Sequence, residues 1–108
     1  MPNQAALIHN VYFWLRKDLT PWEREHFESE LTLLAQTSYL AHAFIGKPAA
    51  TEVRPVTDHS FDYSTSFHFK SMADHEFYQK DCPDHARFVA NCKPFFERVV
   101  VYDVAPLT

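Results

Sequence analysis

Three side chains that could exchange protons stand in distinct surroundings along the sequence. His9 lies in the apolar run LIHNVYFWL, Tyr78 lies in EFYQK, and His85 follows Pro83 in DCPDHARF. A histidine titrates near neutral pH, so it can remove a proton beside a carbonyl group with little change in its pKa. A tyrosine or a second histidine can donate a hydrogen bond to the enolate oxygen that develops. If the fold brings these residues together, they could carry out acid–base chemistry on a carbonyl compound.

Each of these residues also has a purely structural interpretation. His9 could be a core histidine bonded to the backbone, because a buried polar group needs a partner in any case. Tyr78 could be a boundary residue with a hydrated hydroxyl. His85 stands near the start of a helix, where a cation is disfavoured, so a neutral imidazole is favoured there. Cys82 also precedes a helix, which could lower the pKa of its thiol, and a nucleophilic thiol needs an activating base. His85, three residues further on, is the candidate base, but spacing alone does not establish the geometry that a catalytic cysteine requires.

Hydrophobic periodicity predicts the elements that must position these residues. The period-two alternation of 7–16 indicates a strand, and Thr20, Pro21 and Glu23 form a capping-box signature that opens a helix. The predicted elements are a strand over 7–16, a helix over 21–36, strands over 39–47 and 61–69, a helix that is capped by Ser71 and ends at Pro83, a helix over about 84–96 and a strand over 98–104. The order βαββααβ favours a ferredoxin-like α+β fold, an antiparallel sheet with helices on one face. We expect residues 1–108 to form one domain.

Strand alternation also assigns the two faces of the predicted sheet. The helix-covered face would take His9, Val11, Phe13, Thr65, Phe67, Val99 and Val101. The opposite face would take Ile8, Tyr12, Trp14, Val100, Tyr102 and Val104, with no helix to cover them. A face this apolar on a small protein favours a partner, and a second copy is the simplest one. We therefore expect a homodimer that buries Tyr12, Trp14, Val100 and Tyr102.

Composition argues against several classes of partner. The formal net charge is −4, from 14 acidic and 10 basic residues without a basic block, which argues against nucleic acid and against a charged membrane surface. The N-terminal residues lack the features of a signal peptide, so we expect a cytoplasmic protein. Cys82 and Cys92 are expected to remain free thiols. No histidines show ligand spacing on one helix, so neither a metal nor another cofactor is predicted.

Several motifs resemble those of the stress-responsive α/β-barrel (Dabb) family. HNVYF is similar to its opening His-x-Val-x-Phe strand, and PFFERVVVYDV to its closing helix and strand. FYQKDCPDHARF is similar to its Tyr followed by a His-Pro-x-His-x-x-Phe turn. Here Cys82 stands in place of the first His, and one extra residue separates Tyr78 from the turn. The resemblance implies ferredoxin-like monomers whose sheets pair back to back as a dimeric α/β barrel.

One plant branch of this family, the olivetolic acid cyclases, closes a linear polyketide by aldol condensation. The resemblance to that branch implies catalytic roles for His9, Tyr78 and His85. It also implies a substrate-binding pocket lined by Val11, Phe13, Phe27, Leu31, Thr65, Phe88, Phe96, Val99 and Val101.

The sequence thus leaves two functions open and disfavours a third. The first is a homodimeric enzyme that binds a small hydrophobic or aromatic carbonyl compound and uses histidine acid–base chemistry, as in cyclisation or isomerisation. The second is a dimeric binding or stress-response protein without turnover, which would need the same pocket. The third is a haem-linked or other monooxygenase, but no histidine can be singled out as a proximal haem ligand.

Overall fold

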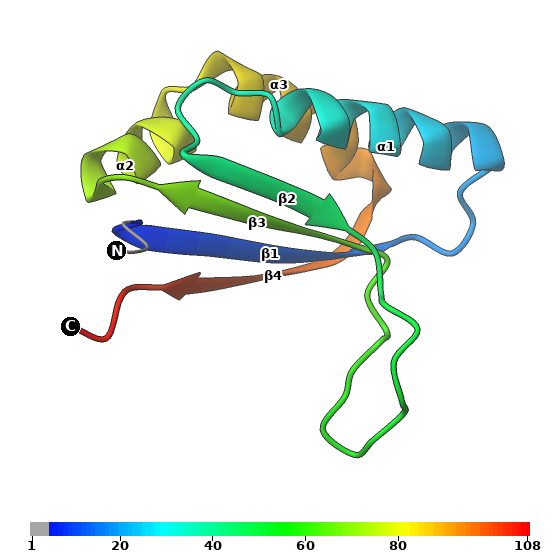
Figure 1. Cartoon of the computed structure of the whole chain (residues 1–108). Helices are drawn as coiled ribbons and strands as arrows, with labels where there is room; N and C mark the ends of the chain where they lie inside the picture. Colours follow the sequence, from blue (N-terminus) through cyan, green and yellow to red (C-terminus); the bar gives the residue numbers. More distant parts are fainter. Residues whose placement is uncertain (1–4) are drawn as a thin grey trace.

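A four-stranded antiparallel sheet with helices on one face is the framework of the chain (Figure 1). The computed structural model describes residues 5–108. Its elements are β1 (Leu7–Leu15), α1 (Pro21–Leu34), β2 (His42–Gly46), β3 (Tyr63–Phe69), α2 (Met72–Lys80), α3 (Pro83–Cys92), a 3₁₀ turn (Lys93–Phe95) and β4 (Phe96–Val104). The strands lie in the order β2-β3-β1-β4. The predicted ferredoxin-like order is confirmed, although β2 and β3 begin two or three residues later than predicted.

Local hydrogen bonds set the helix boundaries. The Thr20 backbone N–H donates to the Glu23 carboxylate at 2.8 Å, and the Glu23 backbone N–H donates to Thr20 Oγ1 at 3.1 Å. This reciprocal pair is the predicted capping box at the start of α1. Ser71 Oγ caps α2 by accepting the Asp74 backbone N–H at 3.0 Å. α3 ends at Cys92 rather than near residue 96. Pro94 lies in the following 3₁₀ turn and cannot continue an α-helix.

The covered face of the sheet carries an aromatic core. The largest fully buried side chains are Phe27, Phe67, Phe69, Leu15, Leu31 and Cys92. Phe13 of β1 contacts Phe27 of α1 and Phe88 of α3, with ring centroids 5.5 and 5.8 Å apart. Each such ring contributes about 1.5–3 kcal/mol when it leaves water. Strand and helices are therefore joined by one continuous group of rings.

The edge strand β4 departs from the predicted burial. Val99 and Val101 pair with Phe13 and Val11 and so point to the helix side, as predicted. They nevertheless remain 39% and 47% exposed. β4 lies at the edge of the sheet, and the space above it belongs to a pocket instead of a packed core.

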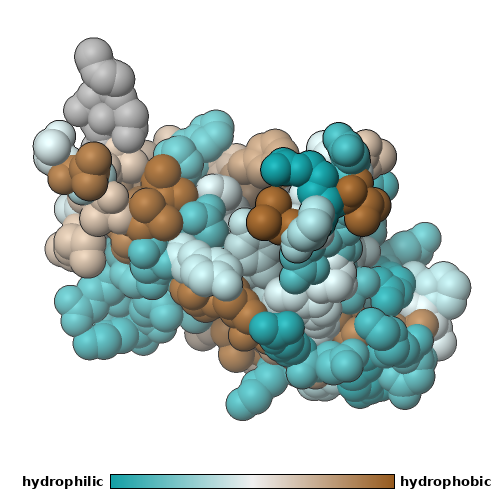
Figure 2. All heavy atoms as spheres, turned by 90° about the horizontal axis from the view of Figure 1, so that it is seen from below, coloured by the Kyte–Doolittle hydropathy of each residue, from teal (hydrophilic) through white to brown (hydrophobic). Residues whose placement is uncertain are grey.

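None of the helices within residues 5–108 covers the opposite face of the sheet (Figure 1). Seen from below, the molecule shows several separate hydrophobic patches among polar side chains (Figure 2). Tyr102 is 61% exposed there. The long connection between β2 and β3 covers part of this face, since the Phe61 ring lies 5.1 Å from Tyr12 and 6.4 Å from Trp14. The strand predicted over 61–69 includes Phe61, but β3 begins only at Tyr63, so the alternation of the strand does not extend to Phe61.

The two cysteines lie in the core. Cys82 and Cys92 are both free thiols, as predicted, and both are buried. Burial raises the pKa of Cys92 to about 12, so this thiol stays protonated and unreactive at neutral pH. Within residues 5–108, none of the helices has the length and apolar character needed to cross a membrane.

Candidate functional site

A pocket of about 380 Å³ lies between the helices and the β4 side of the sheet. Three of its polar side chains are those that the sequence singles out: His9 from β1, Tyr78 from α2 and His85 from α3. The remaining wall is mostly apolar. The complete lining is His9, Val11, Phe13, Leu34, Thr65, Tyr78, Gln79, His85, Phe88, Val89, Phe96, Val99, Val101 and Asp103. We call this cavity the His9 pocket.

His9 is fixed in the His9 pocket by an acidic neighbour. It pairs with Asp103 across β1 and β4, and its Nδ1 lies 2.5 Å from Asp103 Oδ1. A carboxylate only accepts hydrogen bonds, so Nδ1 of His9 is the donor. In a neutral imidazole the lone pair then lies on Nε2. His9 itself is buried, with 5% of its surface exposed, so this bond sets both the tautomer and the orientation of its ring.

Tyr78 lies between the two histidines. Its ring centroid is 6.0 Å from that of His9 and 4.5 Å from that of His85. Burial, with a smaller contribution from Cys82, raises the pKa of Tyr78 well above its usual value. The phenol therefore stays protonated and can act as a hydrogen-bond donor.

His85 is held in its neutral form. Burial lowers the pKa of His85 below 6.5, and nearby positive charge on His9 or His75 lowers it further. A neutral imidazole can accept a proton, which a protonated one cannot. The three residues thus combine one proton acceptor, one fixed imidazole and one proton donor within a mostly apolar cavity.

The structure shows where each predicted site residue lies. His9, Tyr78 and His85 all line the His9 pocket, together with Val11, Phe13, Thr65, Phe88, Phe96, Val99 and Val101. Two predicted lining residues lie elsewhere. Phe27 is fully buried behind the wall against Phe13 and Phe88, because its ring fills the core between α1 and the sheet. Leu31 borders a different cavity.

Two polar residues near His9 escaped the sequence analysis. Asp103 bonds to His9, and the ring of His75 lies 4.9 Å from that of His9. Signals for both were present. Asp103 continues the parity of Val99 and Val101 along β4, and His75 lies three residues before Tyr78 on the same helix.

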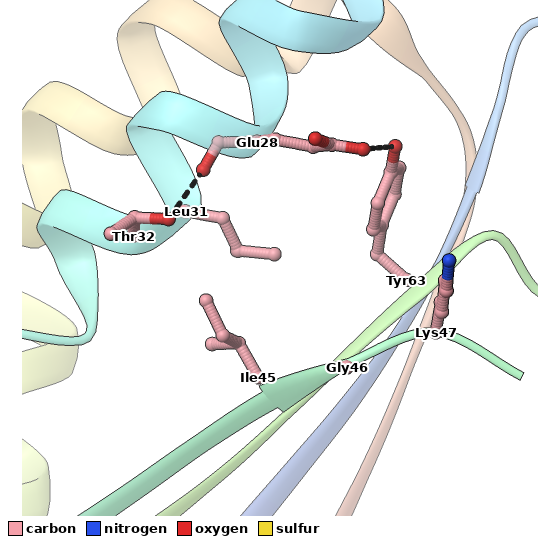
Figure 3. A pocket seen from close by; sticks show the side chains of 7 residues that line it. All are labelled: Glu28, Leu31, Thr32, Ile45, Gly46, Lys47 and Tyr63. Carbon is pink, nitrogen blue, oxygen red and sulfur yellow. Dashed lines mark hydrogen bonds between the residues drawn. The ribbon is translucent and has the colours of Figure 1, made fainter. Parts of the chain in front are cut away.

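The second cavity, bordered by Leu31, has different chemistry. It measures about 340 Å³ and is lined by Glu28, Leu31, Thr32, Ile45, Gly46, Lys47 and Tyr63 (Figure 3). The Tyr63 hydroxyl donates to Glu28 Oε2 at 2.5 Å (Figure 3). Burial and this carboxylate raise the pKa of Tyr63 to about 12. Because the carboxylate is already engaged by a protonated phenol, we take the His9 pocket as the candidate site.

These observations define a ferredoxin-like α+β protein with a small apolar pocket that contains histidines. The chain belongs to the stress responsive A/B barrel domain (Dabb) family, whose sequence model matches residues 7–106. No curated protein matches the chain.

Solved structures share the fold at low sequence identity. A Dabb family protein from Mesorhizobium loti with a ferredoxin-like fold is 24% identical, with a TM-score of 0.75 over 97% of this chain and 100% of that one. A dimeric ferredoxin-like protein of unknown function from Thermobifida fusca is 21% identical, with a TM-score of 0.73 over 93% and 90%. A hydroxynitrile lyase from Passiflora edulis is 17% identical, with a TM-score of 0.74 over 96% and 95%. Likeness at this level establishes the fold.

Proposed function

We propose that the chain forms a homodimer that binds a small hydrophobic or aromatic carbonyl compound in the His9 pocket and transfers protons to and from it. The observation that carries this proposal is the convergence of His9, Tyr78 and His85 in one cavity. A cavity of about 380 Å³ lies near the lower end of the usual size of ligand sites, which favours a small compound. Apolar walls with a few convergent polar groups are typical of such sites.

The roles of the polar groups follow from their protonation. His85, neutral because of burial, would remove a proton next to the carbonyl group. Tyr78 would donate a hydrogen bond to the oxygen that becomes negatively charged. His9, oriented by Asp103, would return the proton or hold the second polar end of the compound. Cyclisation and isomerisation both need this set of steps.

The assembly is proposed from the bare face of the sheet. Tyr12, Trp14, Val100 and Tyr102 lie on that face, and the Thermobifida fusca protein with this fold is described as dimeric. A second copy placed there would bury aromatic side chains that α1, α2 and α3 leave uncovered. The hydroxynitrile lyase shows that an enzyme can be built on this fold, which supports an enzymatic function without indicating a substrate.

The proposal is tested by screening small aromatic and aliphatic ketones and aldehydes for binding and then for turnover. A compound at 100 times its Kd should stabilise the protein by about 2.7 kcal/mol in a thermal-shift assay. His85→Ala should lower the turnover of a binding compound by about 10²–10⁴-fold, because it removes the general base. His59→Ala, in the loop between β2 and β3, is the matched control and should leave turnover unchanged.

Two other outcomes would change the conclusion. If compounds bind, His85→Ala weakens binding modestly and no compound is turned over, the chain is a binding protein without catalysis. If no carbonyl compound shifts the melting temperature, the proposed class of ligand is wrong.

A further inference from the structure

We infer that His9, His75 and Asp103 form a binding site for one divalent transition-metal ion of the zinc type. This inference goes beyond the proposed function, whose proton transfers need no metal. The three residues come from β1, α2 and β4, so their spacing in the sequence gives no metal-binding motif. In the fold, one ligand atom from each lies within 4.8 Å of the other two.

The geometry is close to that of a bound ion. Zinc bonds to nitrogen and carboxylate oxygen are about 2.0–2.2 Å long, so tetrahedral ligand atoms lie about 3.4 Å apart. His9 Nδ1 and Asp103 Oδ1, at 2.5 Å, would separate slightly as the ion replaced the proton between them. Asp103 can make this movement, because its side chain is 42% exposed on the edge strand.

His75 provides an independent reason to expect a ligand. Its Nε2 atom is buried and has no hydrogen-bond partner among the described residues. Buried polar atoms are nearly always satisfied, and an unsatisfied one requires an explanation such as an ion. Phe69 packs against both imidazoles, with ring centroids 6.3 Å from His9 and 5.2 Å from His75, and so restricts their rotation. A coordinated ion would satisfy the buried nitrogen.

The donor set matches one class of metal. Two imidazole nitrogens and one carboxylate oxygen suit zinc and its neighbours in the first transition row, whereas magnesium and calcium prefer oxygen ligands alone. Three protein ligands leave at least one coordination position open. His9 and Asp103 both line the His9 pocket, so that position would be reached from the cavity.

The site is tested by titrating the full chain, after treatment with EDTA and desalting, with Zn²⁺ and separately with Co²⁺. Calorimetry should show one strong site per chain. Co²⁺ should produce visible absorption bands from imidazole and carboxylate coordination. His75→Ala and Asp103→Asn should each weaken binding by more than about 100-fold, since even residues that only orient a ligand account for 10–100-fold. Circular dichroism should show that both variants keep the fold, because neither residue belongs to the packed core.

Control variants separate this site from other histidines. His42 and His68 lie together on the bare face, with ring centroids 5.0 Å apart, and could hold an ion by themselves. His42→Ala should leave the strong site intact, and so should His85→Ala, which removes only the proposed base. Strong binding that survives His75→Ala and Asp103→Asn, or that disappears in His42→Ala, would overturn the inference. Failure of Zn²⁺ to bind the unaltered chain at micromolar concentration would overturn it as well.

Discussion

β1 divides its nine residues between two faces that are buried to different degrees. One face places His9, Val11 and Phe13 under helices, where each is at most 8% exposed. The other face places Tyr12 and Trp14 beside a loop, where they contact Phe61 and remain partly exposed. Both faces are rich in apolar side chains, so hydrophobicity alone does not distinguish them. Connectivity therefore decides which face becomes core, because every helix of the described chain returns to the same side of the sheet.

The largest test of this comparison is a pair of matched substitutions of phenylalanine. Phe27→Ala, in the covered core, should lower the free energy of unfolding by about 3–5 kcal/mol, because it leaves a cavity among packed rings. Phe44→Ala, 62% exposed on the bare face of β2, should change it by less than about 0.5 kcal/mol. Urea denaturation at one protein concentration measures both. Equal losses would show that the bare face is packed as tightly as the core.

The second test concerns the proposed partner of the bare face. Tyr102→Glu places a charge at the centre of the predicted interface and should weaken dimerisation by at least about 30-fold, the effect of losing one interface hot spot. Sedimentation or light scattering across a dilution series measures the change. Val53→Glu, on a residue 82% exposed in the loop between β2 and β3, is the control and should leave assembly unchanged. A chain that is already monomeric at micromolar concentration would contradict the prediction.

The smallest expected effect lies on the covered face and is a shift in one titration. In metal-free protein, the His85 imidazole should titrate below 6.5, because burial and then His9 and His75 disfavour its charged form. As the pH falls through 6.5, His85 is therefore protonated in the unfolded chain before it is protonated in the folded chain. This difference lowers the free energy of unfolding on acidification.

NMR of the His85 ring, in the folded chain and in denaturant, measures both midpoints. His75→Ala should move the folded midpoint upward, since it removes one of the neighbouring charges. A folded midpoint equal to the denatured one would contradict the burial that keeps His85 neutral.

Local signals in the sequence were sufficient to predict the elements of the fold. Thr20 and Glu23 specify the start of α1 through hydrogen bonds within a single turn. The alternation of 7–16 predicts both the strand and the side on which His9 lies, because side chains of a strand alternate strictly between faces. Phe61 shows the limit of this approach. The apolar–polar alternation of the sequence starts at Phe61, whereas the strand itself begins only at Tyr63.

Tertiary structure decided which polar groups meet. Nothing in the sequence near His9 indicates Asp103, which reaches it only because β1 and β4 are neighbours with His9 opposite Asp103. His75 joins them because α2 packs over the same end of the sheet, where its ring meets those of His9 and Phe69. Patterns of three or four residues predict local geometry only. The contact between His9 and Asp103, which are 94 residues apart in the sequence, is fixed by the register of the whole sheet. Local patterns therefore specify the elements and their faces, whereas strand register and helix packing specify the site.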